Sequence, residues 1–517
     1  MRRDLIIAVF ISGMTTLAVE LAAARLLGNV FGASNLVWAS IIGLILIYLT
    51  AGYFLGGAWA DRSPTYRTFY TILLWAAVLI ALVPVVSRPV LRAAASAFDT
   101  LQMGALFGAF AAVLALLSIP ITLLGTASPF AIRLAAQDTK HLGSIAGRIY
   151  GISTLGSFLG TFLPVLVLIP IFGTYRTFLV ISAVLLLVAL FGLSRACGWR
   201  AALPYLWMLI LVAALGWRGL PGSDKPTPGL VYETESAYNY IQVLELRGFR
   251  YLRLNEGQGV HSVYHPQQLA YYGPWEMVLA APFFNPAPYD PAEIKSMAIV
   301  GLAAGTTARQ ATAVYGEIAI DGIEIDPRIV DVGRKYFDMN QPNLNVIVQD
   351  GRWGLEHSQR LYQIISIDAY RPPYIPWHLT TREFFAIVRQ KLTPDGVLVI
   401  NVGRSPTDRR LISALSSTLQ TEFSSLHVMD IPDSFNSIMF ATVQLTDPEN
   451  MLHNLVYLAE RSDTHPLLLF ALQRTLENLQ PAPAAGTVFT DDMAPVEWIT
   501  NDMILDYLFF NPTEALQ

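Results

Sequence analysis

The chain has 517 residues, of which 53% are hydrophobic, and a formal net charge of −5 at pH 7. Residues 1–218 hold 14 Lys and Arg against 5 Asp and Glu, a formal charge of +9, and the remainder carries −14. An acidic second half without a basic cluster argues against a nucleic-acid surface. A single cysteine, Cys197, rules out an intrachain disulfide framework, and the scattered histidines give no metal site.

Apolar segments recur through the first 218 residues, and most are near the roughly 20 residues that a membrane-spanning helix needs. We therefore predict a multi-pass α-helical membrane domain at 1–218 with about seven spans in the lipid bilayer. A cleaved signal peptide is not expected, because the first segment lacks a clear cleavage site and more spans follow at once. The segments are 5–27, 36–60, 69–86, 104–124, 145–169, 178–193 and 201–217.

Two charges, Glu20 and Arg25, fall inside the first apolar segment, where charged groups are costly and usually pair or line a polar cavity. Arg25 has a second explanation, because its long side chain can extend to the membrane surface. Glu20 lies deeper and is the better functional candidate. Gly151, Gly156 and Gly160 fall at helical spacing, which favours close packing of helices.

The distribution of Lys and Arg between the segments favours a cytoplasmic N-terminus. Seven full crossings would then place the C-terminal half outside the cell, unless the short last segment, 201–217, does not cross. We expect a cell (inner) membrane protein with a cytoplasmic soluble domain.

The segment 219–229 is rich in glycine and proline and predicts a linker. Residues 230–295 follow as a small β-rich subdomain, with a hairpin formed by 240–246 and 249–254. Strand and helix patterns then alternate over 296–445, which predicts a doubly wound α/β domain of Rossmann-like, methyltransferase type. Its strands are expected near Ile299 and at 318–323, 346–348, 364–367 and 397–400, closed by an antiparallel strand at 435–444, before a C-terminal helical tail at 446–517.

A nucleoside-binding pattern begins where the apolar run 297–300 meets Gly301 and Gly305, at which the backbone can turn and approach a ligand. A second apolar strand then delivers Glu324, at about the distance where a carboxylate accepts both ribose hydroxyls. We predict Glu324 as the ribose ligand.

Two further strand ends carry carboxylates. Asp350 follows the third strand, where it can accept the adenine amine while Gly351 leaves room for the ring. Asp368 ends the fourth strand, at the crevice where ligands bind in open α/β sheets, although such an acid can also cap a helix. With Glu324, these three carboxylates at successive strand ends predict a ligand site.

The chain resembles the spermidine synthases, or polyamine aminopropyltransferases, and in particular their membrane-fused bacterial relatives. The soluble likeness covers about 230–445. It is carried by ESAYNYIQV, LNEGQGVHSVYH, IVGLAAGTTAR, GIEIDP, QDGR and IDAY, and the membrane-fused likeness adds GYFLGGAWADR, VELAAARLLG, GRIYGISTLGSFLG and the tail motif TDDMAPVE.

The resemblance implies an enzyme that transfers an aminopropyl group from decarboxylated S-adenosylmethionine to an amine or polyamine and releases methylthioadenosine, without a metal. Asp368 would be the catalytic base, and a homodimer is expected. The implied nucleoside-binding residues are Gly301, Ala303, Gly305, Glu324, Ile325, Asp350 and Gly351. The implied substrate-binding residues are Tyr238, Asn239, Gln258, Tyr264, Tyr370, Arg371, Asp491 and Asp492.

Two positions depart from the family pattern. Ala304 stands where the family has an aspartate that grips the aminopropyl ammonium, and Arg371 where it has one that holds the acceptor amine. An arginine repels a diamine and attracts a carboxylate. We therefore expect either that putrescine is a poor acceptor or that the true acceptor carries a carboxylate near Arg371; Asp491 and Asp492 offer replacement carboxylates.

Three functions remain open from the sequence. The first is aminopropyl transfer, and the second is methyl transfer or other sulfonium chemistry with intact S-adenosylmethionine. The third is a membrane carrier or sensor whose soluble domain binds nucleoside or polyamine without turnover.

Overall fold

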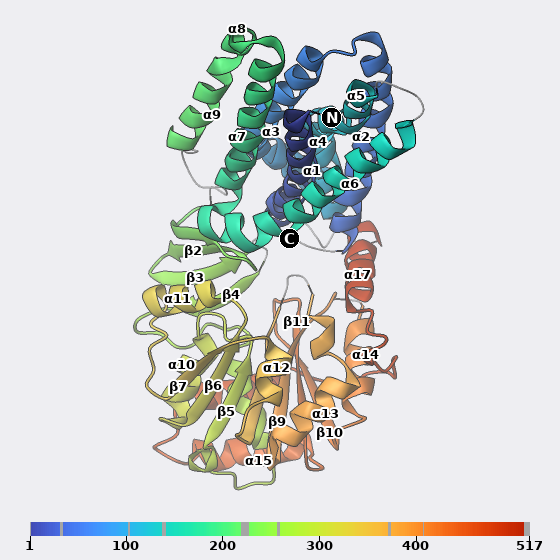
Figure 1. Ribbon diagram of the computed structural model, residues 1–517. Coiled ribbons are helices and arrows are strands. Elements are labelled where there is room, and N and C mark those ends of the chain that lie inside the picture. Colours follow the sequence, from blue (N-terminus) through green and yellow to red (C-terminus); the bar gives the residue numbers. More distant parts are fainter. Residues whose placement is uncertain are drawn as a thin grey trace. The chain divides into compact units, whose positions relative to one another are not determined.

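The computed structural model describes residues 2–31, 35–101, 104–136, 141–218, 227–255, 259–370, 374–406 and 408–510. They form two compact units. The first, helical unit comprises Met1–Pro226 with Thr234–Tyr240, and the second, α/β unit comprises Thr227–Glu233 with Ile241–Gln517. Figure 1 colours the chain from blue through green and yellow to red along the sequence.

The helical unit is built around α1, which packs against α6 and α7, while α3 packs against α4 and α7 and α2 against α4. Its core is aliphatic and aromatic, with Phe69, Tyr70, Phe130 and Phe178 fully buried. The helices are α1 (Arg3–Phe31), α2 (Asn35–Arg62), α3 (Tyr66–Leu101), α4 (Gly104–Gly125), α5 (Ala127–Ala135), α6 (Leu142–Leu163), α7 (Ile169–Cys197), α8 (Trp199–Ala202) and α9 (Leu206–Arg218), with a π-helical turn at Pro164–Leu168.

Six helical stretches of the described chain are long and apolar enough to cross a membrane. The difference from the seven predicted segments arises in Leu142–Cys197, a continuous stretch of 56 residues that contains the expected segments 145–169 and 178–193. Gly173 interrupts it with φ of 77°, outside the helical region. Apolar composition alone could not separate one kinked stretch from two spans.

The close packing predicted from the glycines of α6 is present between α6 and α1. A Cβ on Gly156 would lie 2.0 Å from the Phe10 carbonyl oxygen, and one on Gly160 would lie 2.1 Å from that of Met14. Gly151, by contrast, has no atom within 4 Å of its Cβ position. Two of the three glycines therefore allow the helix backbones to approach each other, and the third faces open space.

Arg25 of α1 is held within the helical unit by the segment Thr234–Tyr240. Its guanidinium donates to the carbonyl oxygens of Ser236 at 2.8 Å and Tyr238 at 3.0 Å. Glu235 accepts hydrogen bonds from the backbone and hydroxyl of Thr174. The guanidinium of Arg25 thus binds backbone groups inside the helical unit. The segment Thr234–Tyr240 belongs to that unit, although the sequence analysis predicted it as part of the β-rich subdomain.

A four-stranded sheet of order β1-β2-β3-β4 precedes the larger one, with β1 (Leu230–Glu235), β2 (Tyr240–Leu246), β3 (Phe249–Leu254) and β4 (Val260–Tyr264). Strands β2 and β3 form the predicted antiparallel hairpin. Its turn has positive φ at Arg247 (52°) and Gly248 (84°), as a two-residue hairpin connection requires.

The α/β unit contains an eight-stranded sheet of order β12-β10-β11-β9-β8-β5-β6-β7. Strands β7, β6, β5, β8 and β9 are parallel, and β11 joins β9 antiparallel. This confirms the predicted fold class and its antiparallel closure. The strands are β5 (Ser296–Val300), β6 (Ala319–Glu324), β7 (Leu344–Val348), β8 (Tyr362–Ile367), β9 (Leu392–Gly403), β10 (Ser425–Asp430), β11 (Asn436–Thr442) and β12 (Leu479–Gln480).

Helices cover both faces of this sheet (Figure 1), and a separate apolar cluster fills each side. One cluster joins β5 and β6 to α10, α15, α16 and the 3₁₀ segment Glu276–Phe284, and the other joins β8 and β9 to α12, α13 and α14. The helices are α10 (Thr306–Tyr315), α11 (Pro327–Tyr336), α12 (Gly351–Glu356), α13 (Arg382–Lys391), α14 (Arg410–Leu419), α15 (Pro448–Ala459), α16 (Pro466–Glu477) and α17 (Val496–Phe510).

Candidate active site

The glycine loop between β5 and α10 has a left-handed backbone at three positions: φ is 89° at Gly301, 49° at Ala303 and 83° at Gly305. A Cβ on Gly301 would lie 2.6 Å from the backbone nitrogen of Ala369. The loop therefore lies directly against the chain that leaves β8, which places it beside Asp368.

Glu324, at the end of β6, is 7% exposed and faces this loop. Its Oε2 accepts a hydrogen bond from the Ala303 amide and its Oε1 one from the Asp326 amide, both at 3.0 Å. Burial raises the pKa of Glu324 to about 7, although these amide hydrogen bonds lower it. A carboxylate offers about four lone-pair sites, so these amide bonds leave capacity for a ligand hydroxyl.

Asp350 is the N-cap of α12, where it accepts from the amides of Arg352 and Trp353. Its other oxygen lies 3.1 Å from His378 Nε2. A Cβ on Gly351 would lie 2.5 Å from a methyl carbon of Val300, so a larger residue does not fit there. Asp350 thus caps a helix, and its predicted adenine contact stays a prediction.

Asp368 directly follows β8, and its Oδ1 accepts a hydrogen bond from Asn401 Nδ2 at 2.9 Å. Asn401 Oδ1 in turn accepts from Asn436 Nδ2 at 2.9 Å, across the antiparallel pair β9 and β11. Burial raises the pKa of Asp368 to about 6, while the Asn401 hydrogen bond lowers it. A carboxyl group of this kind is suited to accept a proton near neutral pH.

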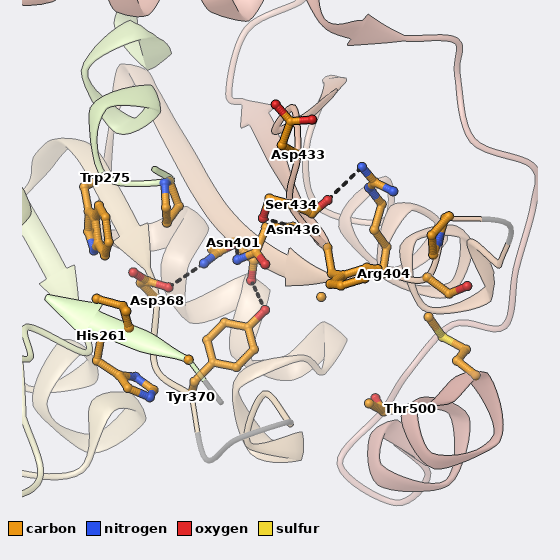
Figure 2. Close-up of a pocket in the computed structure, with 18 of the residues that line it drawn as sticks. His261, Trp275, Asp368, Tyr370, Asn401, Arg404, Asp433, Ser434, Asn436 and Thr500 are labelled. Atoms are coloured by element: carbon orange, nitrogen blue, oxygen red, sulfur yellow. Dashed lines mark hydrogen bonds between the residues drawn. The ribbon is translucent and has the colours of Figure 1, made fainter. Parts of the chain in front are cut away.

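Asp368 lines a cavity of about 600 Å³ within the α/β unit (Figure 2). Aromatic side chains form part of its wall, polar groups of β9 and β11 form another part, and α17 contributes Thr500 and Met503. The lining residues that bear most on chemistry are His261, Trp275, Ala303, Asp368, Tyr370, Asn401, Arg404, Asp433, Phe435 and Asn436. Burial lowers the pKa of His261 to about 4, so this imidazole is neutral at pH 7.

Tyr370 is the predicted substrate residue that the structure places in the same cavity as Asp368. Its hydroxyl donates to the Asn401 carbonyl oxygen at 3.0 Å. Tyr264, at the end of β4, instead lies under the Arg309 guanidinium, whose central carbon is 4.5 Å from the ring centroid. Gln258 and Arg371 lie outside the described residues.

Other predicted residues lie apart from the cavity lining. Tyr238 and Asn239 belong to the segment that groups with the helical unit. Ile325 is 40% exposed beside Glu324. Asp491 is bound through both oxygens by Arg352, at 2.7 and 2.8 Å, and this ion pair holds its pKa below the ordinary range. Asp492 follows on the exposed turn before α17.

Ala304, the first departure from the family pattern, is 2% exposed. Its amide donates a hydrogen bond to Ser262 Oγ at 2.9 Å. The Thr306 hydroxyl accepts a hydrogen bond from the Val263 amide and donates one to the Val263 carbonyl oxygen. These contacts attach β4 to the glycine loop. Ala304 therefore makes a buried backbone contact at the position where the family pattern has a charged aspartate.

Sequence reasoning missed Asn401, Asn436, Arg404 and Trp275, all of which line the cavity. One sequence feature points to Asn401: it directly follows the predicted strand 397–400, at the same sheet edge as Asp368. Asn436 has no comparable local feature. Within the part of the chain that the structure describes, no group of three or more His, Cys, Asp and Glu is arranged to hold a metal ion.

A family model described as the spermine/spermidine synthase domain matches residues 285–454. A probable polyamine aminopropyl transferase of Bifidobacterium longum is 32% identical over 281 residues, which are 52% of this chain and 61% of that protein. The polyamine aminopropyltransferase of Vibrio vulnificus is 32% identical over 225 residues, 41% of this chain and 71% of that protein. The chain thus spans about three fifths of the length of the Bifidobacterium relative.

Among solved structures, a probable spermidine synthase from Corynebacterium glutamicum is similar with a TM-score of 0.39 and 19% identity. The similarity covers 52% of this chain and 99% of that one. Spermidine synthase from Thermotoga maritima has a TM-score of 0.35 and 19% identity, over 43% of this chain and 77% of that one.

Proposed function

Because the chain belongs to the polyamine aminopropyltransferase (spermine/spermidine synthase) family, we propose that it transfers an aminopropyl group from decarboxylated S-adenosylmethionine to an amine. The observation that carries the proposal is the carboxylate of Asp368. It combines a position at the end of β8, a place in the wall of a large cavity and a pKa of about 6.

The nucleoside is bound, in this proposal, by the glycine loop and Glu324. The left-handed turns at Gly301 and Gly305 bring backbone close to the ligand, and Glu324 accepts the two ribose hydroxyls with its remaining lone pairs. The two hydrogen bonds from the ribose hydroxyls to the Glu324 carboxylate also orient the sulfonium. Since a sulfonium is already a good leaving group, positioning supplies most of the remaining catalysis.

Asp368 acts on the acceptor. The acceptor ammonium gives one proton to the carboxylate, and the freed nitrogen attacks the propyl carbon next to sulfur. A nitrogen–carbon bond forms as the carbon–sulfur bond breaks, and the electron pair stays on sulfur in neutral methylthioadenosine. Asn401 keeps Asp368 ionised for this step by donating a hydrogen bond to it.

The helical unit anchors this activity to a membrane, in the same proposal. Its six long apolar stretches fit a bilayer span by length and composition. The amine acceptor would then be modified at the membrane surface by the α/β unit.

The test is a product assay with the full chain in detergent or nanodiscs. Decarboxylated S-adenosylmethionine and a panel of amines should release methylthioadenosine and yield an aminopropylated amine, detected by mass spectrometry. Asp368→Asn should lose at least about a hundredfold in turnover while it still binds the nucleoside. Asp331→Asn, at an exposed position on α11, is the matched control.

Release of S-adenosylhomocysteine from intact S-adenosylmethionine would replace the proposal with methyl transfer. Nucleoside binding without any product, across all amines and both sulfonium compounds, would leave a binding protein.

A further inference from the structure

The cavity contains a charge pattern that the aminopropyl transfer does not need. Its described lining has one carboxylate at Asp368, a guanidinium at Arg404 and a second carboxylate at Asp433. In the view of Figure 2, Asn401 lies between Asp368 on one side and Arg404 on the other. A simple diamine offers two positive charges and nothing for Arg404.

Arg404 is held in place and only partly neutralised. Its side chain is 12% exposed, its Nε lies 3.3 Å from Asp430, and its Nη2 donates to the Ser434 carbonyl oxygen at 3.1 Å. Asp430 is bound more closely by Arg409, through two hydrogen bonds of 2.7 and 3.0 Å. The single carboxylate of Asp430 thus pairs with the guanidinium groups of both Arg404 and Arg409. These three side chains together carry one net positive charge.

Burial alone would raise the pKa of Asp430, but the hydrogen bonds from Arg409 and Ser437 and the charge of Arg404 hold it below the ordinary range. Asp430 therefore stays ionised, and its single negative charge remains shared. An anionic group in the cavity would satisfy the remaining donors of Arg404, because a guanidinium has five N–H donors and can bind one carboxylate through two parallel hydrogen bonds.

Asp433 lies in the turn between β10 and β11, next to Ser434, whose carbonyl oxygen Arg404 binds. Asp433 and Arg404 thus supply one negative and one positive side chain to the lining of the same cavity. An α-amino acid headgroup carries the complementary pair, an ammonium and a carboxylate on one carbon.

Asp368 and Arg404 line the same cavity, which at about 600 Å³ has room for a small acceptor that contacts both side chains. Trp275 and Phe435, which also line the cavity, provide an apolar wall for the methylene groups.

We propose that the acceptor is a diamino carboxylic acid, whose terminal amine is aminopropylated at Asp368 while Arg404 binds its carboxylate and Asp433 its α-ammonium. This inference rests on the proposed function and specifies its substrate class. The bonds made and broken are those given above, and the product keeps the carboxylate.

The experiment compares three acceptors with decarboxylated S-adenosylmethionine and the full chain, by release of methylthioadenosine. Ornithine carries both headgroup charges, 5-aminopentanoate lacks the α-ammonium, and putrescine lacks the carboxylate. We expect kcat/KM for ornithine to exceed that for putrescine at least tenfold. Arg404→Gln should lower this ratio at least tenfold, and Asp433→Asn should lower the ratio of ornithine to 5-aminopentanoate.

Arg334→Gln is the matched control, because Arg334 is exposed on α11 and is not among the described lining residues. It should leave the ornithine-to-putrescine ratio unchanged. If Arg404→Gln does not fold, the comparison of kcat/KM for ornithine and putrescine in the parent protein alone tests the proposed substrate class.

A parent that prefers putrescine, with a ratio unaffected by Arg404→Gln, would overturn the substrate class and leave aminopropyl transfer standing. Absence of methylthioadenosine with every acceptor would instead overturn the proposed function itself.

Discussion

Asn401 Nδ2 donates a hydrogen bond of 2.9 Å to Oδ1 of Asp368. The orientation of this amide is fixed from behind, since its oxygen accepts from Asn436 on the neighbouring strand β11. A donor to a carboxylate favours the ionised form, so Asn401 opposes the effect of burial. The pair of asparagines therefore sets the pH range in which Asp368 can accept a proton.

The first prediction concerns the pH profile. Because only ionised Asp368 accepts a proton and its pKa is about 6, kcat/KM should fall about tenfold per pH unit below that value. Asn401→Leu removes a hydrogen bond to a charged group, worth about 1.5–3 kcal/mol. The inflection should therefore move up by about one to two pH units, with activity recovering at high pH.

Asn345→Leu serves as control, because Asn345 donates to a different carboxylate, Asp321, at 2.8 Å. Its inflection should stay at that of the parent. A loss of activity in Asn401→Leu that is equal at every pH would contradict the assigned role and indicate a purely structural one.

The second prediction concerns Glu324. Hydrogen bonds to a charged acceptor are worth about 1.5–3 kcal/mol each, so Glu324→Ala should weaken nucleoside affinity at least tenfold, as measured by calorimetry. Since the pKa of Glu324 is about 7, affinity of the parent should also fall as the pH is lowered from 8 to 6. Glu317→Gln, an exposed change after α10, should bind like the parent; unchanged affinity in a folded Glu324→Ala would remove the ribose assignment.

The third prediction is a stability gain in an inactive variant. Burial raises the pKa of Asp368 from 3.8 to about 6, so the folded state holds this proton more tightly than the unfolded state. The resulting penalty is absent below pH 3.8, grows as the pH rises to 6 and is complete above it, at about 1–3 kcal/mol.

Asp368→Asn keeps the hydrogen bond from Asn401 and removes the charge. It should therefore raise the melting temperature of the purified chain at pH 8, with roughly half that effect near pH 5. Equal melting temperatures of variant and parent at pH 8 would show that the charge is well solvated in the cavity.

The fourth prediction concerns the helical unit. Gly156→Leu would force a side chain into the Phe10 carbonyl, 2.0 Å from the Cβ position, whereas Gly151→Leu on the same helix meets open space. Overpacking a buried contact costs about 1–3 kcal/mol or more. We expect a lower yield of monodisperse protein in detergent for Gly156→Leu alone, and similar yields for both variants would argue against the α1–α6 contact.

The sheet was predictable because β5, β6 and β8 come from short apolar runs that stop at glycine or an acid. The stops at Gly301, Glu324 and Asp368 therefore marked both the strand ends and the candidate ligand groups. The strand β10 was missed because Ser425–Asp430 mixes polar and apolar residues without a clear period.

The rest of the site depends on contacts between distant residues. Asn436 reaches Asn401 through antiparallel pairing of β11 with β9, and no local pattern links positions 35 apart. Asp491 shows the opposite case. Its acidic turn was predicted to be a ligand site, but both of its carboxylate oxygens accept hydrogen bonds from Arg352. A partner of this kind cannot be seen in a single segment of sequence.

The turn between β10 and β11 brings Asp433, Ser434 and Phe435 to the cavity, while Asp368 and the glycine loop directly follow the buried parallel strands β8 and β5. A surface turn tolerates exchange far better than a central strand does. In the proposals made above, one part of the acceptor site, Asp433, therefore lies on a segment separate from the one that carries Asp368. Grafting a different turn at 431–435 is accordingly a practical route to transferases that modify other amines.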